Sequence, residues 1–403
     1  MRLPKPLGRY PVGFSEYTFQ VSTPRVIGKA RLQDGETPAL RLDEVCFSTF
    51  YPTEDKHQKA RPGVGWLPRP VGAMLRGYAT FLGVSRWLLV PLAYVWGVLL
   101  KMPLSQDSPL RKSEEIHPSP VGKWPLIVFS HGLAGTRNTY SQFCSNLASE
   151  GYVVLSLEHR DRSGPAFIDP KSGDEQHYFR IEEVKWEKGY APPDHMPWKV
   201  EQLEFRRNEV YEALKALRTT EIADLVDFEQ NIVMAGHSFG SATSLSILSH
   251  PPPSGFEPLP IRQTILLDPW VEPFAPSGPL PLPLSKERPT ACVIASEAFT
   301  IWDVNFDRLQ EIVKAWKDDE KTAAYLMTIL RSGHSDFSDF GILVPWAKRG
   351  AGVIKGTHET VMKFLQGSLD ADLKNKGKVM EIEQIKKNKR QIKGEPGELF
   401  VHV

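Results

Sequence analysis

The chain has 403 residues, of which 41% are hydrophobic and 24% charged, and its 49 basic and 48 acidic side chains almost cancel. This composition is typical of a globular protein and lacks the strong positive field that attracts nucleic acid. The three cysteines, Cys46, Cys144 and Cys292, are too few and too far apart for a disulfide framework or a zinc cluster, which favours a reducing, cytoplasmic location.

The first fifty residues predict strands rather than a targeting signal. Residues 1–10 carry prolines and charges where a signal peptide has its apolar core. Residues 10–52 contain strand-like pieces between glycine and proline turns, most clearly at 42–51. We expect this segment to join the central sheet as antiparallel strands.

An apolar insertion at residues 79–104 leaves two interpretations open. Residues 87–100 carry no charge, but the run is too short for a transmembrane span of about 20 residues, and a proline and a glycine interrupt it. A buried core helix and a helix lying in a lipid headgroup layer fit the sequence about equally well, and a transmembrane helix fits it less well. The candidate interfacial side chains are Trp87, Leu88 and Trp96.

A βαβ unit is expected next. Residues 124–135 form an apolar strand that runs into a glycine-bearing loop, residues 138–150 show helical spacing, and residues 152–157 form another apolar strand. The crossover in such a unit is right-handed. Residues 163–200 lose periodicity and mix aromatic, charged and proline residues, which predicts a loop insertion, and helical spacing returns at 201–218.

The segment 231–244 carries the most informative motif, in which an apolar run is followed by Gly-x-Ser-x-Gly and by a small-residue helix. Gly236 and Gly240 remove side chains that would clash in a sharp strand-to-helix turn, so Ser238 can adopt a strained backbone conformation that presents its hydroxyl. This arrangement is the nucleophile elbow of an α/β-hydrolase. It makes Ser238 the candidate nucleophile.

The chain after the elbow alternates predicted strands and helices. Strands are expected at 264–268, 291–295 and 326–330, and helices at 306–317 and 357–366. With the βαβ unit, these elements predict one α/β-hydrolase catalytic domain over residues 1–368, with a mostly parallel central sheet flanked by helices. Residues 369–403 are rich in Lys and Glu and poor in apolar side chains, which predicts a solvated tail or a terminal helix.

A serine nucleophile needs a base to take its proton and an acid to orient that base, and in this fold the acid precedes the histidine. Asp268 ends a predicted strand, where an α/β sheet gathers its active-site groups, and Asp303 is the second choice. His334 lies in a loop directly after the last predicted strand, which leaves its imidazole able to reach Ser238. The histidines that fit less well are His250, His358 and His402.

Attack on an ester carbonyl places negative charge on oxygen, and backbone amides that point at it stabilise the transition state by roughly 3–4 kcal/mol each. One such amide should belong to Phe239, next to the nucleophile. The other should belong to Leu133, because Gly132 permits the turn that directs this amide inward.

Four polar residues near these loops are assigned no catalytic role. His131 and His237 adjoin backbone positions that the turns require, and we interpret them as structural supports. His159 and Asp161 hint at a metal pair, but no third ligand has a matching spacing. We therefore expect no metal and no cofactor.

Three segments of the chain resemble the plasma and type II platelet-activating-factor acetylhydrolases, a family of α/β-hydrolases. They comprise residues 129–140 through 157–163, residues 236–243, and residues 267–270 with 334–340. The run Glu-His-Arg-Asp-Arg-Ser, which ends the first segment, is far more specific than Gly-x-Ser-x-Gly. The resemblance extends from about residue 40 to about residue 365, and the chain departs from the family pattern at Ser241 and Pro269.

The resemblance implies that Ser238, Asp268 and His334 form the catalytic triad and that the Leu133 and Phe239 amides form the oxyanion hole. It also implies a glycerophospholipid substrate with a short sn-2 acyl chain, cleaved without calcium and loaded from a lipid interface, which favours the interfacial interpretation of residues 79–104. We therefore predict a peripheral membrane serine esterase, a 1-alkyl-2-acetylglycerophosphocholine esterase of phospholipase A2 type. The alternatives are a general short-chain carboxylesterase and a non-catalytic lipid-binding protein on a hydrolase scaffold.

Overall fold

The computed structural model describes residues 1–55, 63–112, 122–274, 288–317, 322–343, 348–373, 380–386 and 389–402. The chain forms two compact units. The first consists of Met1–Asp227 with Pro253–Phe256, and the second of Phe228–Pro252 with Glu257–Val403. The elbow and the candidate acid and base belong to the second unit, whereas the apolar insertion and the loop at 131–135 belong to the first.

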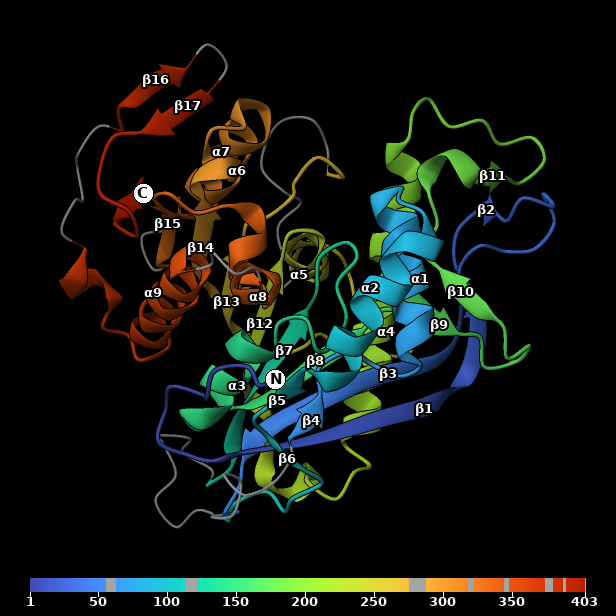
Figure 1. The fold of residues 1–403 in the computed structure, drawn as a ribbon, viewed down its shortest axis with the longest axis horizontal. Coiled ribbons are helices and arrows are strands. Elements are labelled where there is room, and N and C mark those ends of the chain that lie inside the picture. Colours follow the sequence, from blue (N-terminus) through green and yellow to red (C-terminus); the bar gives the residue numbers. More distant parts are fainter. Residues whose placement is uncertain are drawn as a thin grey trace. The chain divides into compact units, whose positions relative to one another are not determined.

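The first unit holds a sheet with the strand order β7-β8-β3-β1-β6 (Figure 1, blue and green). The long strands β1 (Val12–Val26) and β3 (Arg41–Pro52) pair antiparallel, as do β3 and β8 (Val153–Glu158). β7 (Trp124–Ser130) runs parallel to β8, and helix α3 (Ser141–Ser149) connects them. The antiparallel strands and the βαβ unit predicted from the sequence are both confirmed.

The predicted loop insertion contains short ribbons. β9 (Ala166–Ile168) pairs antiparallel with β10 (Glu175–His177), and β11 (Lys185–Trp186) pairs antiparallel with β2 (Ala30–Arg31). Helix α4 (Met196–Leu217) then begins earlier than the sequence predicts. Its first turn contains a proline, and because N–H groups in the first turn have no acceptor within the helix, the missing proline N–H costs no hydrogen bond.

The second unit holds the parallel part of the fold. β12 (Val226–His237), β13 (Ile261–Leu267), β14 (Thr290–Ser296) and β15 (Ala324–Ile329) pair parallel in this order. Helices α5 (Phe239–Ser249), α7 (Asp303–Lys317) and α9 (Lys348–Leu365) follow β12, β14 and β15 respectively in the chain. The strands and helices predicted after the elbow are therefore present, with shifted ends.

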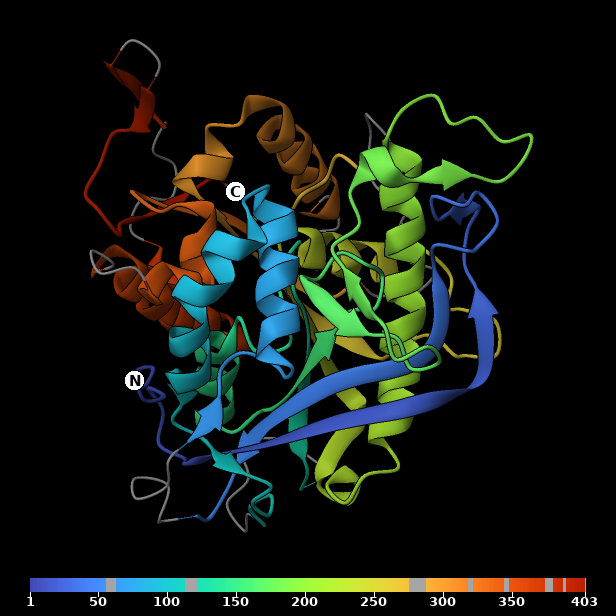
Figure 2. The ribbon, with the colours of Figure 1, turned by 45° about the vertical axis from the view of Figure 1, so that its right-hand side comes forward.

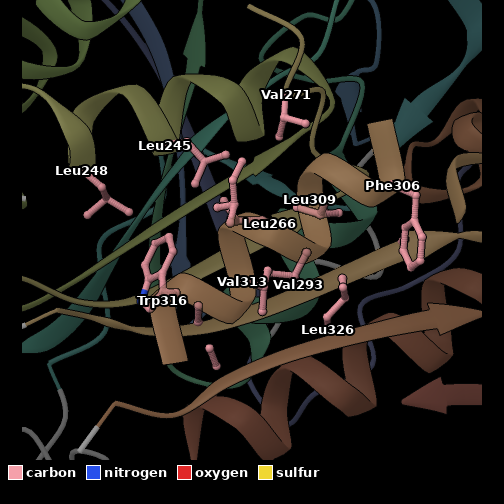
Figure 3. Close-up of a cluster of buried hydrophobic side chains, with 14 residues drawn as sticks. Leu245, Leu248, Leu266, Val271, Val293, Phe306, Leu309, Val313, Trp316 and Leu326 are labelled. Atoms are coloured by element: carbon pink, nitrogen blue, oxygen red, sulfur yellow. The ribbon is translucent and has the colours of Figure 1, made fainter. Parts of the chain in front are cut away.

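An apolar cluster joins α5 and α7 to these strands (Figure 3). Leu309 and Val313 of α7 are 1% exposed, and they share the cluster with Leu245 of α5 and with Leu266 and Leu326 of the strands. Burying a leucine side chain stabilises a fold by about 1.5–3 kcal/mol, so this cluster holds α5 behind the elbow.

The prediction of a solvated tail or terminal helix after residue 368 is wrong for the described part of that segment. β16 (Ile382–Lys386) and β17 (Lys389–Ile392) form a hairpin, and β18 (Leu399–Val401) pairs antiparallel with β15. Ile392 and Phe400 are buried with Leu330. A few apolar residues among many charges suffice here, because the edge of β15 offers unpaired backbone groups. Residues 374–379 and 387–388 lie outside the described residues.

Helix α2 (Arg86–Leu99) follows α1 (Val71–Leu82) (Figure 2, light blue) and forms the exposed part of the apolar insertion. Within α2, all of whose residues the structure describes, Gly97 alone is buried. A Cβ atom at Gly97 would lie 2.8 Å from Leu67 Cδ1 and 3.1 Å from Val71 Cγ1, so the helix approaches these two side chains closely at Gly97. The exposed large apolar side chains of α2 are Trp87, Leu88, Leu92, Tyr94, Val95, Trp96 and Leu99.

This exposure contradicts the prediction of a buried core helix for the residues of α2. Trp87 is 79% exposed and Leu92 is 68% exposed, whereas a core leucine such as Leu309 is 1% exposed. Among the described helices none is long and apolar enough to cross a membrane. The interfacial interpretation of this helix stays a prediction.

Candidate active site

Ser238 occupies a sharp turn between β12, which ends at His237, and α5, which begins at Phe239. Its backbone has φ 58° and ψ −120°, an unfavourable conformation that costs about 1–3 kcal/mol. A Cβ atom at Gly236 would lie 2.3 Å from the backbone carbon and oxygen of Gly240, so this close approach requires glycine. The strained turn that the Gly-x-Ser-x-Gly motif predicts is therefore present.

Hydrogen bonds fasten this turn to the end of β13. The Ser238 N–H donates to the Leu267 carbonyl (2.8 Å), and the Ser241 hydroxyl lies 3.0 Å from the same oxygen and 2.7 Å from the Gly236 carbonyl. Ser241 stands where the family pattern usually has glycine, and these contacts give its hydroxyl a structural role. They also hold Ser238 beside the residue that follows Leu267, which is Asp268.

Asp268 is fully buried at the C-terminal end of β13 and has a positive φ of 44°. Its carboxylate accepts hydrogen bonds from the backbone N–H of Ser296 (2.5 Å), from the Ser296 hydroxyl (2.7 Å) and from Nδ1 of His334 (2.8 Å). Because carboxylate oxygens accept, the last contact places the imidazole proton on Nδ1 and leaves Nε2 with a lone pair. This is the tautomer that a general base needs.

His334 lies after β15, and two aromatic rings restrict its imidazole. The ring of Phe299 stacks on it at 4.3 Å with an interplanar angle of 7°, and the ring of His237 lies 4.4 Å away. The His334 side chain remains 39% exposed, so substrate can reach it. Burial lowers the pKa of His237 well below its usual value, and His334 lowers this pKa further, so His237 is neutral at pH 7.

The alternative acid and bases are engaged elsewhere. Asp303 is an exposed residue whose carboxylate pairs with Arg390 at 2.9 Å. His250 contacts the Ser246 carbonyl at 2.9 Å, and His402 contacts the Thr328 hydroxyl at 2.7 Å, while His358 is buried within α9. The structure thus brings Asp268 and His334 together, and none of these other groups joins them.

Sequence reasoning missed Ser296 and Phe299. Ser296 ends β14, binds the Asp268 carboxylate twice and accepts a hydrogen bond from the Phe299 N–H (3.2 Å) as the N-cap of α6 (Glu297–Thr300). A signal was available, because Ser296 follows the predicted strand 291–295 and the carboxyl ends of parallel strands meet at one edge. Phe299 carried no such signal.

The same cluster has the residue types of a metal site. Potential ligand atoms of His237, Asp268 and His334 lie within 4.8 Å of one another. Both oxygens of Asp268 already accept hydrogen bonds, one of them from His334. The donor set therefore fits a hydrogen-bonded acid and base better than a cation.

The two amides predicted for the oxyanion hole belong to different units. Phe239 begins α5 in the second unit, and N–H groups in the first turn of a helix point toward its N-terminal end. Leu133 lies in the first unit, in the loop after β7. Within the described part of the chain, no hydrogen-bond acceptor meets the Leu133 N–H.

Comparison with known proteins gives a family and a fold. The family described as platelet-activating factor acetylhydrolase, isoform II, matches residues 1–357. The platelet-activating factor acetylhydrolase of Canis lupus familiaris is 27% identical over 95% of this chain and 77% of its own length. A putative phospholipase A2 of Schizosaccharomyces pombe is 28% identical over 82% of this chain and 80% of its own length.

Among solved structures, a ferulic acid esterase from Streptomyces cinnamoneus matches with a TM-score of 0.56 and 15% identity, over 92% of each chain. This likeness shows the fold, and it agrees with the predicted α/β-hydrolase architecture and its parallel strands. Family and fold together support an ester hydrolase. The chain belongs to the platelet-activating factor acetylhydrolase isoform II family.

Proposed function

We propose that this protein is a calcium-independent serine esterase that removes a short sn-2 acyl group, acetyl above all, from ether or oxidised glycerophospholipids. The observation that carries the proposal is the hydrogen bond between the buried Asp268 and His334, beside the strained Ser238 turn. The family match and the relatives named platelet-activating factor acetylhydrolase supply the substrate class.

In this mechanism, Ser238 Oγ attacks the sn-2 carbonyl carbon while His334 Nε2 takes the hydroxyl proton. Asp268 holds Nδ1–H and stabilises the imidazolium that forms. The tetrahedral intermediate collapses to an acyl-enzyme, and His334 returns the proton to the departing lysophospholipid oxygen. A water molecule then attacks the acyl-enzyme with the same base, which releases the short acid and restores Ser238.

Charge on the carbonyl oxygen is met by backbone N–H groups in this proposal. The amides of Leu133 and Phe239 take this role, and each contributes roughly 3–4 kcal/mol to transition-state stabilisation. Because these donors and the imidazole supply all the polarisation and proton transfer that ester cleavage needs, the proposed mechanism uses no calcium.

We assign the loading of substrate to the exposed face of α2. A helix with Trp87, Leu88 and Trp96 exposed can insert these side chains among acyl chains, with the tryptophans at headgroup level. The position of the helix supports this role, because Gly97 fixes its inner face against Leu67 and leaves the apolar side chains outside.

Basic side chains lie close to the end of α2 and would add attraction to anionic lipid. The residue pair Leu3 and Lys101 ties the N-terminal segment to the chain after α2, with Leu3 N donating to the Lys101 carbonyl (2.9 Å). This N-terminal segment lines a cavity of about 170 Å³ whose described lining includes Arg2, Lys5 and Arg9 and no acidic residue.

The test is the initial rate on phosphatidylcholines whose sn-2 chain grows from two carbons upward. The proposal predicts the highest rate at two carbons and a steep fall beyond the short chains. Equal rates on lipids and on soluble acetyl esters would favour a general carboxylesterase. Ser238 that does not react with a fluorophosphonate probe would favour a non-catalytic lipid-binding protein.

A further inference from the structure

A dense network of buried charged and polar side chains lies in the first unit, around the loop 131–135. Arg206 of α4 is fully buried and pairs with the fully buried Asp161, at 2.8 Å from Nε to Oδ2. His159 is also buried and contacts Glu209 (2.6 Å) and the Ser130 hydroxyl (2.7 Å). The sequence hinted at a metal pair of His159 and Asp161, but here each has a protein partner of its own.

Arg206 connects this network to the loop. Its Nη1 donates to the carbonyl of His131 (2.7 Å), and its Nη2 donates to the hydroxyl of Ser163 (2.5 Å). The carbonyl of Ser163 in turn accepts the N–H of Ala134 (2.7 Å), a loop residue with a positive φ of 57°. One guanidinium therefore holds the loop at both ends, directly at His131 and through Ser163 at Ala134.

The imidazole of His131 links the 158–163 segment to the carbonyl of Gly132. Its Nε2 accepts the backbone N–H of His159 (3.2 Å), so the ring proton lies on Nδ1, which donates to the Gly132 carbonyl (2.7 Å). Burial and, after it, the charge of Arg206 lower the pKa of His131 to about 3, so the ring stays neutral in this tautomer. The Gly132 carbonyl also accepts the Gly135 N–H (3.1 Å).

The Gly132 carbonyl belongs to the same planar peptide as the N–H of Leu133. In a trans peptide these two groups point in opposite directions, so a carbonyl fixed by two donors also fixes the direction of the amide. The Leu133 N–H therefore points away from the Gly132 carbonyl, and it is the group that binds the oxyanion in the proposed function. The motif Glu-His-Arg-Asp-Arg-Ser at residues 158–163 thus supplies the frame for this peptide.

We propose that Arg206 is a positioning residue for ester hydrolysis, which acts by fixing the direction of the Leu133 amide through His131 and the 158–163 segment. This inference rests on the proposed function, since it needs an oxyanion to be stabilised. Arg206 itself touches no reacting atom. Its loss should therefore weaken transition-state binding while substrate binding stays the same.

The test uses Arg206→Met with Asp161→Asn, because removing one partner alone would leave an unpaired buried charge. The matched control is Arg25→Met with Glu212→Gln, which deletes another ion pair of α4 (3.0 Å) away from the loop. Rates are measured on a water-soluble acetyl ester, per active site counted with a fluorophosphonate. We expect kcat to fall about 100-fold in the first variant with KM nearly constant, as for a misplaced catalytic group, and less than twofold in the control.

Two further measurements separate positioning from a merely structural role. The affinity for a trifluoromethyl ketone, which mimics the tetrahedral intermediate, should fall by the same factor as kcat/KM. Arg206→Lys keeps the charge but lacks the fork that reaches Asp161, His131 and Ser163 together, so its kcat should be intermediate. If the double variant does not fold, His131→Phe, which leaves every charge in place, should give the same pattern.

An unchanged kcat in a folded variant, or a loss of kcat with unchanged inhibitor affinity, overturns the positioning role. The soluble ester keeps this outcome apart from the substrate question, because oxyanion stabilisation is common to all acyl esters. A wild-type protein that hydrolyses no ester at all would instead contradict the proposed function, and the inference would fall with it.

Discussion

Two apolar stretches of this chain look alike in sequence and end in opposite environments. The strand before the elbow, Ile232 to Ala235, is fully buried, whereas α2 turns Trp87, Leu92 and Trp96 to solvent. The buried strand pairs through its backbone with a parallel neighbour, while α2 packs against α1 with one face and buries only Gly97 completely. Apolar composition alone therefore does not decide whether a segment is buried. The buried strand leads into the candidate nucleophile, whereas α2 presents apolar side chains to solvent.

The largest expected effect concerns the elbow side of this comparison. Ser238→Ala, Asp268→Asn and His334→Ala should each reduce kcat on a soluble acetyl ester by about 10⁴-fold or more, and combining them should add little, because the three residues act as one unit. The matched control is Asp303→Asn, which removes an exposed carboxylate. Wild-type turnover in Asp268→Asn together with loss in the control would move the acid to Asp303.

The second prediction sets a buried leucine against an exposed one, both on helices. Leu309→Ala in α7 truncates a side chain that is 1% exposed and should lower the free energy of unfolding by about 2–5 kcal/mol. Leu92→Ala in α2 truncates one that is 68% exposed and should change it by less than about 0.5 kcal/mol. Denaturant unfolding measures both, and equal losses would mean that α2 is buried in solution.

The third prediction sharpens the role of the exposed stretch. Replacing Trp87, Leu88 and Trp96 with Gln should weaken vesicle binding at least tenfold, since each buried side chain contributes about 1.5–3 kcal/mol and about 1.4 kcal/mol is a factor of ten. Hydrolysis of a soluble ester should stay unchanged. Val304→Ser is the control, because it removes another exposed apolar side chain, 71% exposed, from a different helix. Unaltered sedimentation with vesicles would refute the interfacial role.

The smallest effect is expected from metal removal. The cluster of His237, Asp268 and His334 can be viewed as metal ligands or as an acid and its base. The hydrogen bond from His334 to Asp268 favours an acid and its base. Dialysis against EDTA should therefore leave the rate unchanged, and added calcium should not raise it. A chelated protein that regains activity with one divalent ion would reverse this assignment.

The sequence predicted those parts of the fold that depend on residues close together in the chain. The elbow was predictable because two glycines and a serine at fixed spacing leave few alternatives, and Asp268 because it follows an apolar run. The pairing of β18 with β15 was not predictable, since three residues far along the chain carry no periodicity. The exposure of α2 was not predictable either, because a uniformly apolar run has no polar face that would set its orientation.

The buried charges of the first unit were missed for another reason. The charged Arg206 and Glu209 lie on one face of α4 with the polar Gln202, but charged and polar residues on a helix usually mark its solvent side. Their burial follows from partners in the 158–163 segment, which lies far away in sequence. Only the structure reveals that such partners meet.

In the proposed mechanism, Ser238, activated by His334 and Asp268, carries the acyl group. The most direct measurement is labelling with a fluorophosphonate to one equivalent, followed by peptide mass analysis and by assay of acetyl-ester hydrolysis on the same sample. We expect a single adduct on Ser238, a loss of activity in proportion to labelling, and no adduct in His334→Ala at the same exposure time. Full hydrolysis by a protein stoichiometrically labelled at Ser238, or a label on another residue that tracks the loss of activity, would contradict it.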